Sequence, residues 1–248
     1  MQNRSGIHLS VVIPAFNEER RLPSTLKQVL RYLAAQAYLS EVIVVDDGST
    51  DDTEQVVREQ MTETVPLHLV KHPDAANHGK GAAVRRGLWE ARGEFRLFMD
   101  ADHSTTIEQV ERFWPPFEDG YDIVIGSRDI DGAQITVSQP WPKALAGDLG
   151  NLFIRVMAVP GIHDTQAGFK MFTAACVEDV FPHLTLDRWG FDIEILAIAQ
   201  RRGYRIKEIP ITWTNSPESK VGLGAYFEVL GEVWRIRRNL RSGVYDRS

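Results

Sequence analysis

The sequence predicts an α/β fold in which a mostly parallel sheet is flanked by helices. The first half of the chain alternates short apolar runs with helical patterns, and the connections between them are short. That alternation is typical of a parallel sheet covered on both faces. At 248 residues, with ordinary apolar and charged fractions, the chain is also long enough to bury a substantial core.

Four runs in the first half have the apolar, β-branched composition of buried strands. They are Leu9–Ala15, Glu41–Asp46, Leu67–Val70 and the run from Phe95 to Asp100. Between them, apolar residues recur at three- and four-residue spacing, which predicts three amphipathic helices. The first of these carries Leu26, Val29, Leu30 and Leu33, with Ser24 or Thr25 as its capping residue.

The second half is less regular. We expect strands over residues 121–127 and 205–213, helices over 144–159 and 193–202, and a long polar loop over 129–143. The last helical pattern, residues 225–240, is amphipathic and rich in arginine. We therefore predict one domain over residues 1–220, followed by an amphipathic, basic C-terminal helix and tail over residues 221–248.

Two carboxylates one residue apart, Asp100 and Asp102, follow the strand that begins at Phe95. Side chains at positions i and i+2 of an extended segment point the same way, so both carboxylates can face one ligand. Such a pair suits a hard divalent cation, Mg²⁺ or Mn²⁺, that also binds substrate phosphates. The alternative is a solvated turn after a buried strand.

Other polar residues also fall where strands end. Glu18 follows the first strand, and Asp46 and Asp47 end the second. Ligands of parallel α/β sheets bind beyond the carboxyl ends of the strands, so the topology alone gathers these side chains around Asp100 and Asp102.

Composition excludes several classes of protein. A net charge of −6 and a pI near 5.7 argue against a nucleic-acid-binding protein. The single cysteine, Cys176, cannot form an internal disulfide, and its apolar neighbours indicate a buried residue. Residues 1–8 lack the apolar core of a signal peptide, and no segment has the ~18 apolar residues that span a bilayer. We therefore expect a cytoplasmic protein.

Several ordered motifs resemble those of family 2 glycosyltransferases, which have the GT-A fold. In the first half they are VVIPAFNEE (11–19), VDDGSTD (45–51), NHGKGAAV (77–84) and DAD (100–102). In the second half, GIHDTQAGFK (161–170) and RWGFDIEI (188–195) are similar to polyprenyl-phosphate sugar synthases, most closely dolichyl-phosphate β-glucosyltransferases. The resemblance covers residues 9–220.

The resemblance implies a role for individual residues. Those that would bind the nucleotide and the rest of the donor are Pro14, Ala15, Glu18, Asp46, Asp47 and Lys80, with Lys80 at the diphosphate. Asp100 and Asp102 would hold Mg²⁺ or Mn²⁺. Those that would meet the acceptor or its phosphate are Arg128, Lys143, Ser219 and Lys220. From the residues alone, Asp47 could also serve only turn chemistry, and Lys80 could be a solvated lysine at a helix start.

The resemblance further implies an inverting transfer of a hexose from a nucleotide sugar to a lipid phosphate. A phosphate oxyanion is already a nucleophile, whereas a sugar hydroxyl would need a base, for which Asp192 is the candidate; otherwise Asp192 caps a helix. Mannosyl-transferring relatives often carry a Gln where this chain has Ser104, which favours UDP-glucose over GDP-mannose.

Three alternatives remain open at this stage. They are a GDP-mannose-dependent enzyme, a family 2 enzyme that transfers to a hydroxyl, and a non-catalytic nucleotide-sugar-binding subunit. A lipid acceptor also requires contact with a membrane surface, for which the helix over residues 144–159 and the arginine-rich tail are the candidates. The sequence does not fix the oligomeric state.

Overall fold

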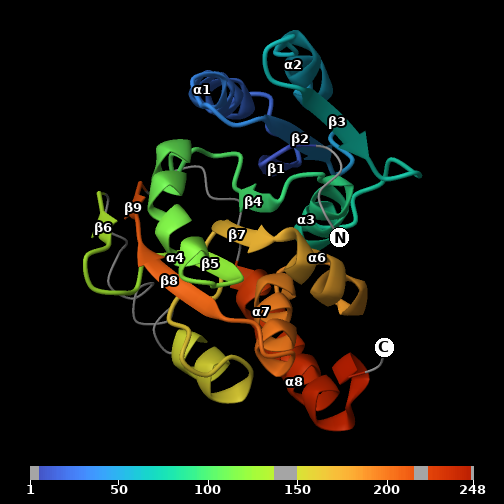
Figure 1. The fold of residues 1–248 in the computed structure, drawn as a ribbon. Helices are drawn as coiled ribbons and strands as arrows, with labels where there is room; N and C mark the ends of the chain where they lie inside the picture. The colour runs from blue at the N-terminus through green and yellow to red at the C-terminus, as the bar shows by residue number, and fades with distance from the viewer. Residues whose placement is uncertain (1–5, 137–149, 215–222, 247–248) are drawn as a thin grey trace.

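The computed structural model describes residues 6–136, 150–214 and 223–246. Its centre is a seven-stranded sheet with the strand order β3-β2-β1-β4-β7-β5-β8 (Figure 1). The strands of this sheet are β1 Leu9–Ala15, β2 Ser40–Asp46, β3 Leu67–Lys71, β4 Phe95–Met99, β5 Ile123–Ser127, β7 Phe169–Thr173 and β8 Ile206–Pro210. Two short strands, β6 Gln134–Ile135 and β9 Thr212–Trp213, pair separately.

The sheet is mostly parallel, as the sequence predicts. The exception is β7, which enters between β4 and β5 and runs antiparallel to both. Every residue of β2 is buried, and β1 is buried apart from the half-buried Pro14, because helices cover both faces of the sheet.

Helices lie on the two faces of the sheet (Figure 1). On one face lie α1 Leu22–Ala34, α2 Thr53–Glu59 and α4 Trp114–Glu118, with a 3₁₀ turn at Ile107–Arg112. On the other lie α3 Lys80–Glu90, α6 Ala174–Val180, α7 Phe191–Arg201 and α8 Leu223–Ser242, with a helix over residues 150–157 and 3₁₀ turns at Phe181–His183 and Val244–Asp246.

Side chains of each inner strand alternate between two cores. In β1, Val11 and Ile13 pack with α1, whereas Val12 packs with α3. All three are fully buried, and burying such a side chain stabilises the fold by about 1.5–3 kcal/mol. Cys176 is buried in the core that contains Val12, which confirms the buried position predicted from its apolar neighbours.

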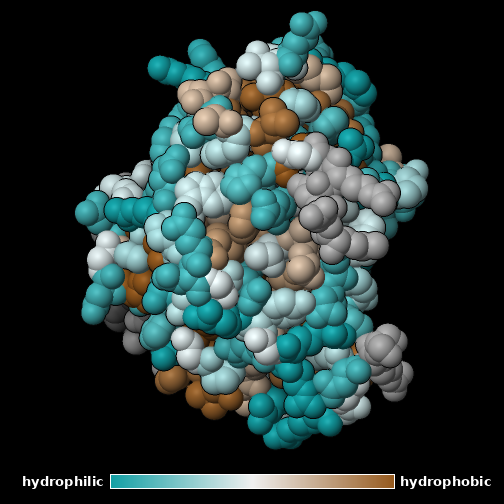
Figure 2. Space-filling view, viewed as in Figure 1, coloured by the Kyte–Doolittle hydropathy of each residue, from teal (hydrophilic) through white to brown (hydrophobic). Residues whose placement is uncertain are grey.

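The C-terminal helix α8 packs onto α7 and the helix over residues 150–157. Val233 and Ile236 of α8 belong to the core, and the Arg237 guanidinium donates to the carbonyl of Met157 over 3.2 Å. Apolar side chains nearby remain exposed, among them Val156 at 70% and Trp234 at 59%. Figure 2 shows apolar surface at the lower end of the molecule, where the helix over residues 150–157 lies in Figure 1.

Some element boundaries differ from the sequence-based ones. The first helix begins at Leu22, so Ser24 and Thr25 lie inside it and cap nothing; Pro23 sits in its first turn, where no backbone N–H is needed. The last expected strand is divided at Ile211 into β8 and β9, and the loop after Ser127 contains β6. None of the helices in the described ranges is both long and apolar enough to span a bilayer.

Candidate active site

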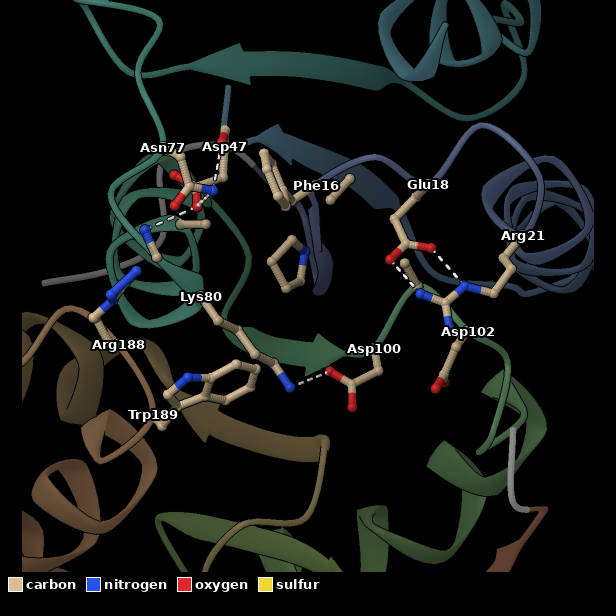
Figure 3. Close-up of a pocket in the computed structure, with 15 residues that line it drawn as sticks. Phe16, Glu18, Arg21, Asp47, Asn77, Lys80, Asp100, Asp102, Arg188 and Trp189 are labelled. Carbon is tan, nitrogen blue, oxygen red and sulfur yellow. Dashed lines mark hydrogen bonds and ion pairs between the residues drawn. The ribbon is translucent and has the colours of Figure 1, made fainter. Parts of the chain in front are cut away.

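A pocket of about 390 Å³ opens where β1, β2 and β4 end (Figure 3). Its walls come from the loops after these strands, from the start of α3 and from the segment before α7. The lining residues are Pro14, Ala15, Phe16, Glu18, Arg21, Asp47, Asn77, Gly79, Lys80, Ala83, Asp100, Ala101, Asp102, Arg188 and Trp189. The volume is that of a small-molecule site.

Asp100 and Asp102 both line the pocket, but the backbone that carries them is not extended as expected. The strand β4 ends at Met99, and the chain turns at residues 101 and 102 instead of continuing extended. The backbone N–H of Asp100 donates to the carbonyl of Gly168 over 3.0 Å, and the carboxylate of Asp102 accepts from the backbone N–H of Ser104 over 3.0 Å.

This carboxylate pair fits a divalent cation that takes its other ligands from water or phosphate oxygens. Within the described ranges, no cluster of three or more His, Cys, Asp or Glu side chains is placed to hold a metal ion. Asp100 and Asp102 are therefore the pocket residues that could hold a divalent cation beside a phosphorylated ligand.

Lys80, at the first position of α3, reaches across the pocket to Asp100. Its Nζ atom lies 2.7 Å from Oδ1 of Asp100 (Figure 3). Burial by itself would lower the pKa of Lys80, but the carboxylates of Asp100, Asp192 and Asp102 outweigh it and hold the pKa above its ordinary value. Lys80 is therefore a cation inside the pocket and not a solvated lysine at a helix start.

Asp47 fixes the loop that leads into α3. Its buried carboxylate accepts hydrogen bonds from the backbone N–H groups of His78 and Gly79 and from the side chain of Asn77, each 2.9 Å long. Gly79 has a φ of +101°, which favours glycine there. Asp47 thus organises the pocket wall.

Asp46, in contrast, serves the turn chemistry that the sequence also allows for Asp47. Its Oδ1 atom accepts from the backbone N–H of Ser49, three residues on, over 2.9 Å. Its side chain is buried, and its Oδ2 atom lies 3.5 Å from Nζ of Lys71. Asp46 is not part of the pocket lining.

The loop after β1 supplies a further wall. Glu18 accepts from the Nε atom of Arg21 over 2.7 Å, and its backbone N–H donates to Thr53 at the start of α2 over 2.8 Å. The carbonyl of Ala15 accepts from the backbone N–H of Asp47 over 2.9 Å, which ties the ends of β1 and β2 together. Pro14, Ala15 and Glu18 are thus brought together with Lys80 and the carboxylate pair, as predicted.

Arg128 lies outside the pocket lining, at the end of β5. Its Nε and Nη2 atoms contact the two oxygens of Asp164 at 2.7 and 2.8 Å, and its guanidinium stacks 5.3 Å from the ring of Trp213. Burial would raise the pKa of Asp164, but Arg128 outweighs burial and holds that pKa below its ordinary value. The expected phosphate-binding arginine is here the partner of a buried carboxylate.

Asp192 does not cap α7, so that interpretation is wrong. The helix begins one residue earlier, at Phe191, with Gly190 as its N-cap residue. The Oδ1 atom of Asp192 lies 2.6 Å from Nζ of Lys170, and both side chains are buried away from the pocket lining. Burial, opposed by Lys170 and Lys80, raises the pKa of Asp192.

Comparison with known proteins identifies the family. The chain matches the family described as Glycosyl transferase family 2 over residues 10–181. It belongs to that family. A dolichyl-phosphate beta-glucosyltransferase of Dictyostelium discoideum is 33% identical over 97% of this chain and 77% of its own. The Homo sapiens protein of the same name is 36% identical over 86% of this chain and 69% of its own.

Solved structures show the same fold. The structure described as glucosyl-3-phosphoglycerate synthase from Mycobacterium tuberculosis, in complex with Mn²⁺, UDP-glucose and phosphoglyceric acid, superposes with a TM-score of 0.64. It is 19% identical and covers 98% of this chain and 80% of its own. The α/β fold with its mostly parallel sheet is thus a GT-A fold, as the sequence resemblance implies.

Several pocket residues of this family 2 glycosyltransferase were not predicted as site residues. They are Phe16, Arg21, Asn77, Arg188 and Trp189. Four of them, Phe16, Asn77, Arg188 and Trp189, fall within the motifs quoted above. Their place in those motifs is the feature of the sequence that could have identified them as site residues. Arg188 and Trp189 reach the pocket because the carbonyl of Asp187 accepts from the backbone N–H of Ala82, which ties their loop to the start of α3. Lys143, Ser219 and Lys220 lie outside the described residues.

Proposed function

We propose that this family 2 glycosyltransferase moves glucose from UDP-glucose to a polyprenyl phosphate of the dolichyl type, with inversion at the anomeric carbon. The observation that carries this proposal is the identity of 33–36% with several dolichyl-phosphate beta-glucosyltransferases over most of the chain. A neighbour with the same fold has UDP-glucose in its complex, which is consistent with this donor.

The pocket supports a nucleoside-diphosphate donor. Lys80 is the pocket cation that would bind the diphosphate, and Asp100 and Asp102 would hold Mg²⁺ or Mn²⁺ beside it. Such an ion, when bound, neutralises charge that develops on the departing nucleoside diphosphate. Pro14, Ala15 and Glu18 line the remaining wall, where the base and ribose would lie.

The surroundings of Asp192 favour a phosphate acceptor over a sugar hydroxyl. A hydroxyl acceptor needs a base within hydrogen-bonding reach of its proton. Asp192 is enclosed with Lys170 and does not line the pocket. A lipid phosphate needs no base at neutral pH, so the protein's part is to position two anionic reactants and to neutralise their charge.

A lipid acceptor requires access to a membrane surface. We propose that the enzyme associates peripherally with the cytoplasmic face of a membrane, through the helix over residues 150–157 and α8. Exposed Val156 and Trp234 supply apolar contacts, and the arginines of α8 supply attraction to anionic lipid.

A transfer assay tests the proposed reaction. Radiolabelled sugar is supplied as UDP-glucose or GDP-mannose with a short polyprenyl phosphate, and with Mg²⁺, Mn²⁺ or EDTA. We expect lipid-linked glucose from UDP-glucose in the presence of either ion and little product with EDTA. Turnover of GDP-mannose alone would overturn the donor, and transfer to a free sugar but not to the lipid phosphate would overturn the acceptor.

A further inference from the structure

The ammonium group of Lys80 is bound to the first carboxylate of the Asp-x-Asp pair. Its Nζ atom lies 2.7 Å from Oδ1 of Asp100, and the two side chains are 28% and 34% exposed. An ion pair that is partly shielded from water is stronger than one on the surface. A divalent cation that binds Asp100 must therefore compete with Lys80 for this carboxylate.

The carboxylate of Asp100 is closed in on one side by Gly168. It lies directly over the Cα atom of Gly168: a Cβ atom at position 168 would be 1.9 Å from Oδ2 of Asp100. The backbone N–H of Asp100 is also fixed, 3.0 Å from the carbonyl of Gly168. Lys80 has a long, flexible side chain. Lys80 is therefore the partner that can swing away and leave the carboxylate of Asp100 to a cation.

The buried carboxylate of Asp192 also lies near Lys80 but is not free to receive it. Its Oδ1 atom is already paired with Nζ of Lys170 at 2.6 Å. The Nζ atoms of Lys80 and Lys170 lie 5.3 and 5.9 Å from the centre of the Phe98 ring, so the two lysines approach the same side chain. Asp192 can neutralise one of these cations but not both.

Charge counting shows what makes the exchange favourable. Asp100, Asp102 and Lys80 together carry one net negative charge, and a divalent cation alone reverses it to one positive charge. The diphosphate of a nucleotide donor supplies two negative charges and restores the original sign. The other charged residues of the pocket cancel, since Glu18 pairs with Arg21, and Asp47 and Arg188 are opposite in sign.

We propose that the ammonium group of Lys80 occupies the position of the divalent cation beside Asp100. Lys80 leaves Asp100 only when a nucleoside diphosphate arrives to bind the lysine. The enzyme consequently takes up metal and nucleotide together and binds either one weakly alone. This inference rests on the proposed nucleotide-sugar transfer for its ligand, but its test does not require the transfer reaction.

Binding of Mn²⁺, followed by the electron paramagnetic resonance signal of the free ion, tests the proposal with and without UDP. In the wild type, UDP should tighten Mn²⁺ binding by about tenfold or more. Lys80→Met should tighten the binding of Mn²⁺ alone by about threefold to tenfold, and it should largely remove the effect of UDP. Lys80→Arg, which retains the cation, should bind Mn²⁺ alone as weakly as the wild type.

Lys27→Met is the matched control, because it removes one positive charge from an exposed position on α1. Its Mn²⁺ affinity should equal that of the wild type. The proposal is overturned if Lys80→Met leaves the affinity for Mn²⁺ alone unchanged or weakens it, or if Lys27→Met tightens it equally. Tighter Mn²⁺ binding by Lys80→Met without glucose transfer by the wild type would support the lysine's role and contradict the proposed reaction.

Discussion

The Nζ atom of Lys170 lies 2.6 Å from Oδ1 of Asp192, and the core encloses both side chains, which are 0% and 5% exposed. Lys170 also donates to the carbonyl of Ala167, two positions before the start of β7. Each charge in such a pair depends on the other, because neither has access to water. The pair therefore links β7 to α7 behind the pocket.

Lys170→Met should destabilise the protein by about 3–5 kcal/mol, because it leaves the carboxylate of Asp192 buried and unpaired. Lys170→Met combined with Asp192→Leu should recover most of the loss, since no buried charge remains. Urea unfolding followed by tryptophan fluorescence measures both. Equal stability of the single and double variants would contradict the coupling, and Lys27→Met controls for the change in net charge.

The ion pair between Arg128 and Asp164 should make stability depend on pH. Burial would raise the pKa of Asp164, but Arg128 holds it below its ordinary value of about 3.9. The unfolded chain therefore binds the proton more readily, so the stabilisation is present above pH ~4 and is lost as the pH falls below it. The difference in unfolding free energy between the wild type and Asp164→Asn should be constant from pH 7 to pH 5 and smaller at pH 3. A difference that does not change with pH would contradict the assignment.

Asp102→Ala should remove the metal-dependent part of nucleotide binding and leave the fold intact. Its carboxylate bonds to Ser104 within its own turn, so its loss changes the core little. Calorimetric titration of UDP with and without Mg²⁺ measures the effect, with Asp119→Ala, at an exposed carboxylate after α4, as the control. Equal UDP affinity in both conditions for the wild type would exclude the metal role.

The location of the pocket could be predicted from local patterns. Parallel strands end at one edge of the sheet, so polar residues placed after β1, β2 and β4 gather there without further information. Asp100, Lys80 and Glu18 were found in this way or through the motifs around them. Predicting where these residues lie requires only the order of strands and helices along the chain, which hydrophobic periodicity indicates.

The partners of the second-half residues could not be predicted, because they depend on where β7 enters the sheet. β7 lies antiparallel between β4 and β5, with Phe98 opposite Lys170. This insertion brings Asp164 to Arg128, and Lys170 to Asp192. No local periodicity shows that a strand from late in the chain fills that place, so neither the pairing of Arg128 with Asp164 nor that of Asp192 with Lys170 could be predicted.

Exposed apolar side chains near α8 should contribute to membrane binding. Val156 and Trp234 are 70% and 59% exposed, on two helices that Arg237 links through the carbonyl of Met157. Val156→Ser and Trp234→Ser should each reduce flotation with anionic liposomes, and together they should reduce it further. Trp89→Ser, at a 55% exposed position on α3, is the control. Wild-type protein that stays at the bottom of the gradient would contradict the proposed contact.

Gly168→Ala should impair the site by displacing the carboxylate of Asp100. The φ of Gly168 does not lie in the left-handed region, so alanine suits the backbone there. Its Cβ atom, however, would be 1.9 Å from Oδ2 and 2.9 Å from Oδ1 of Asp100, so the carboxylate must be displaced. A displacement of about 1 Å at a reacting centre can lower kcat/KM by about a hundredfold.

Two measurements separate this effect from a general loss of structure. UDP affinity in the presence of Mn²⁺ should fall for Gly168→Ala, whereas UDP affinity in EDTA and the melting temperature should change little. Gly231→Ala, in α8, is the matched control, because a Cβ atom there meets no other group within 4 Å. If Gly168→Ala retains full metal-dependent UDP binding, then the carboxylate of Asp100 is not held in the position that the metal requires, and Asp102 must bind the metal without it.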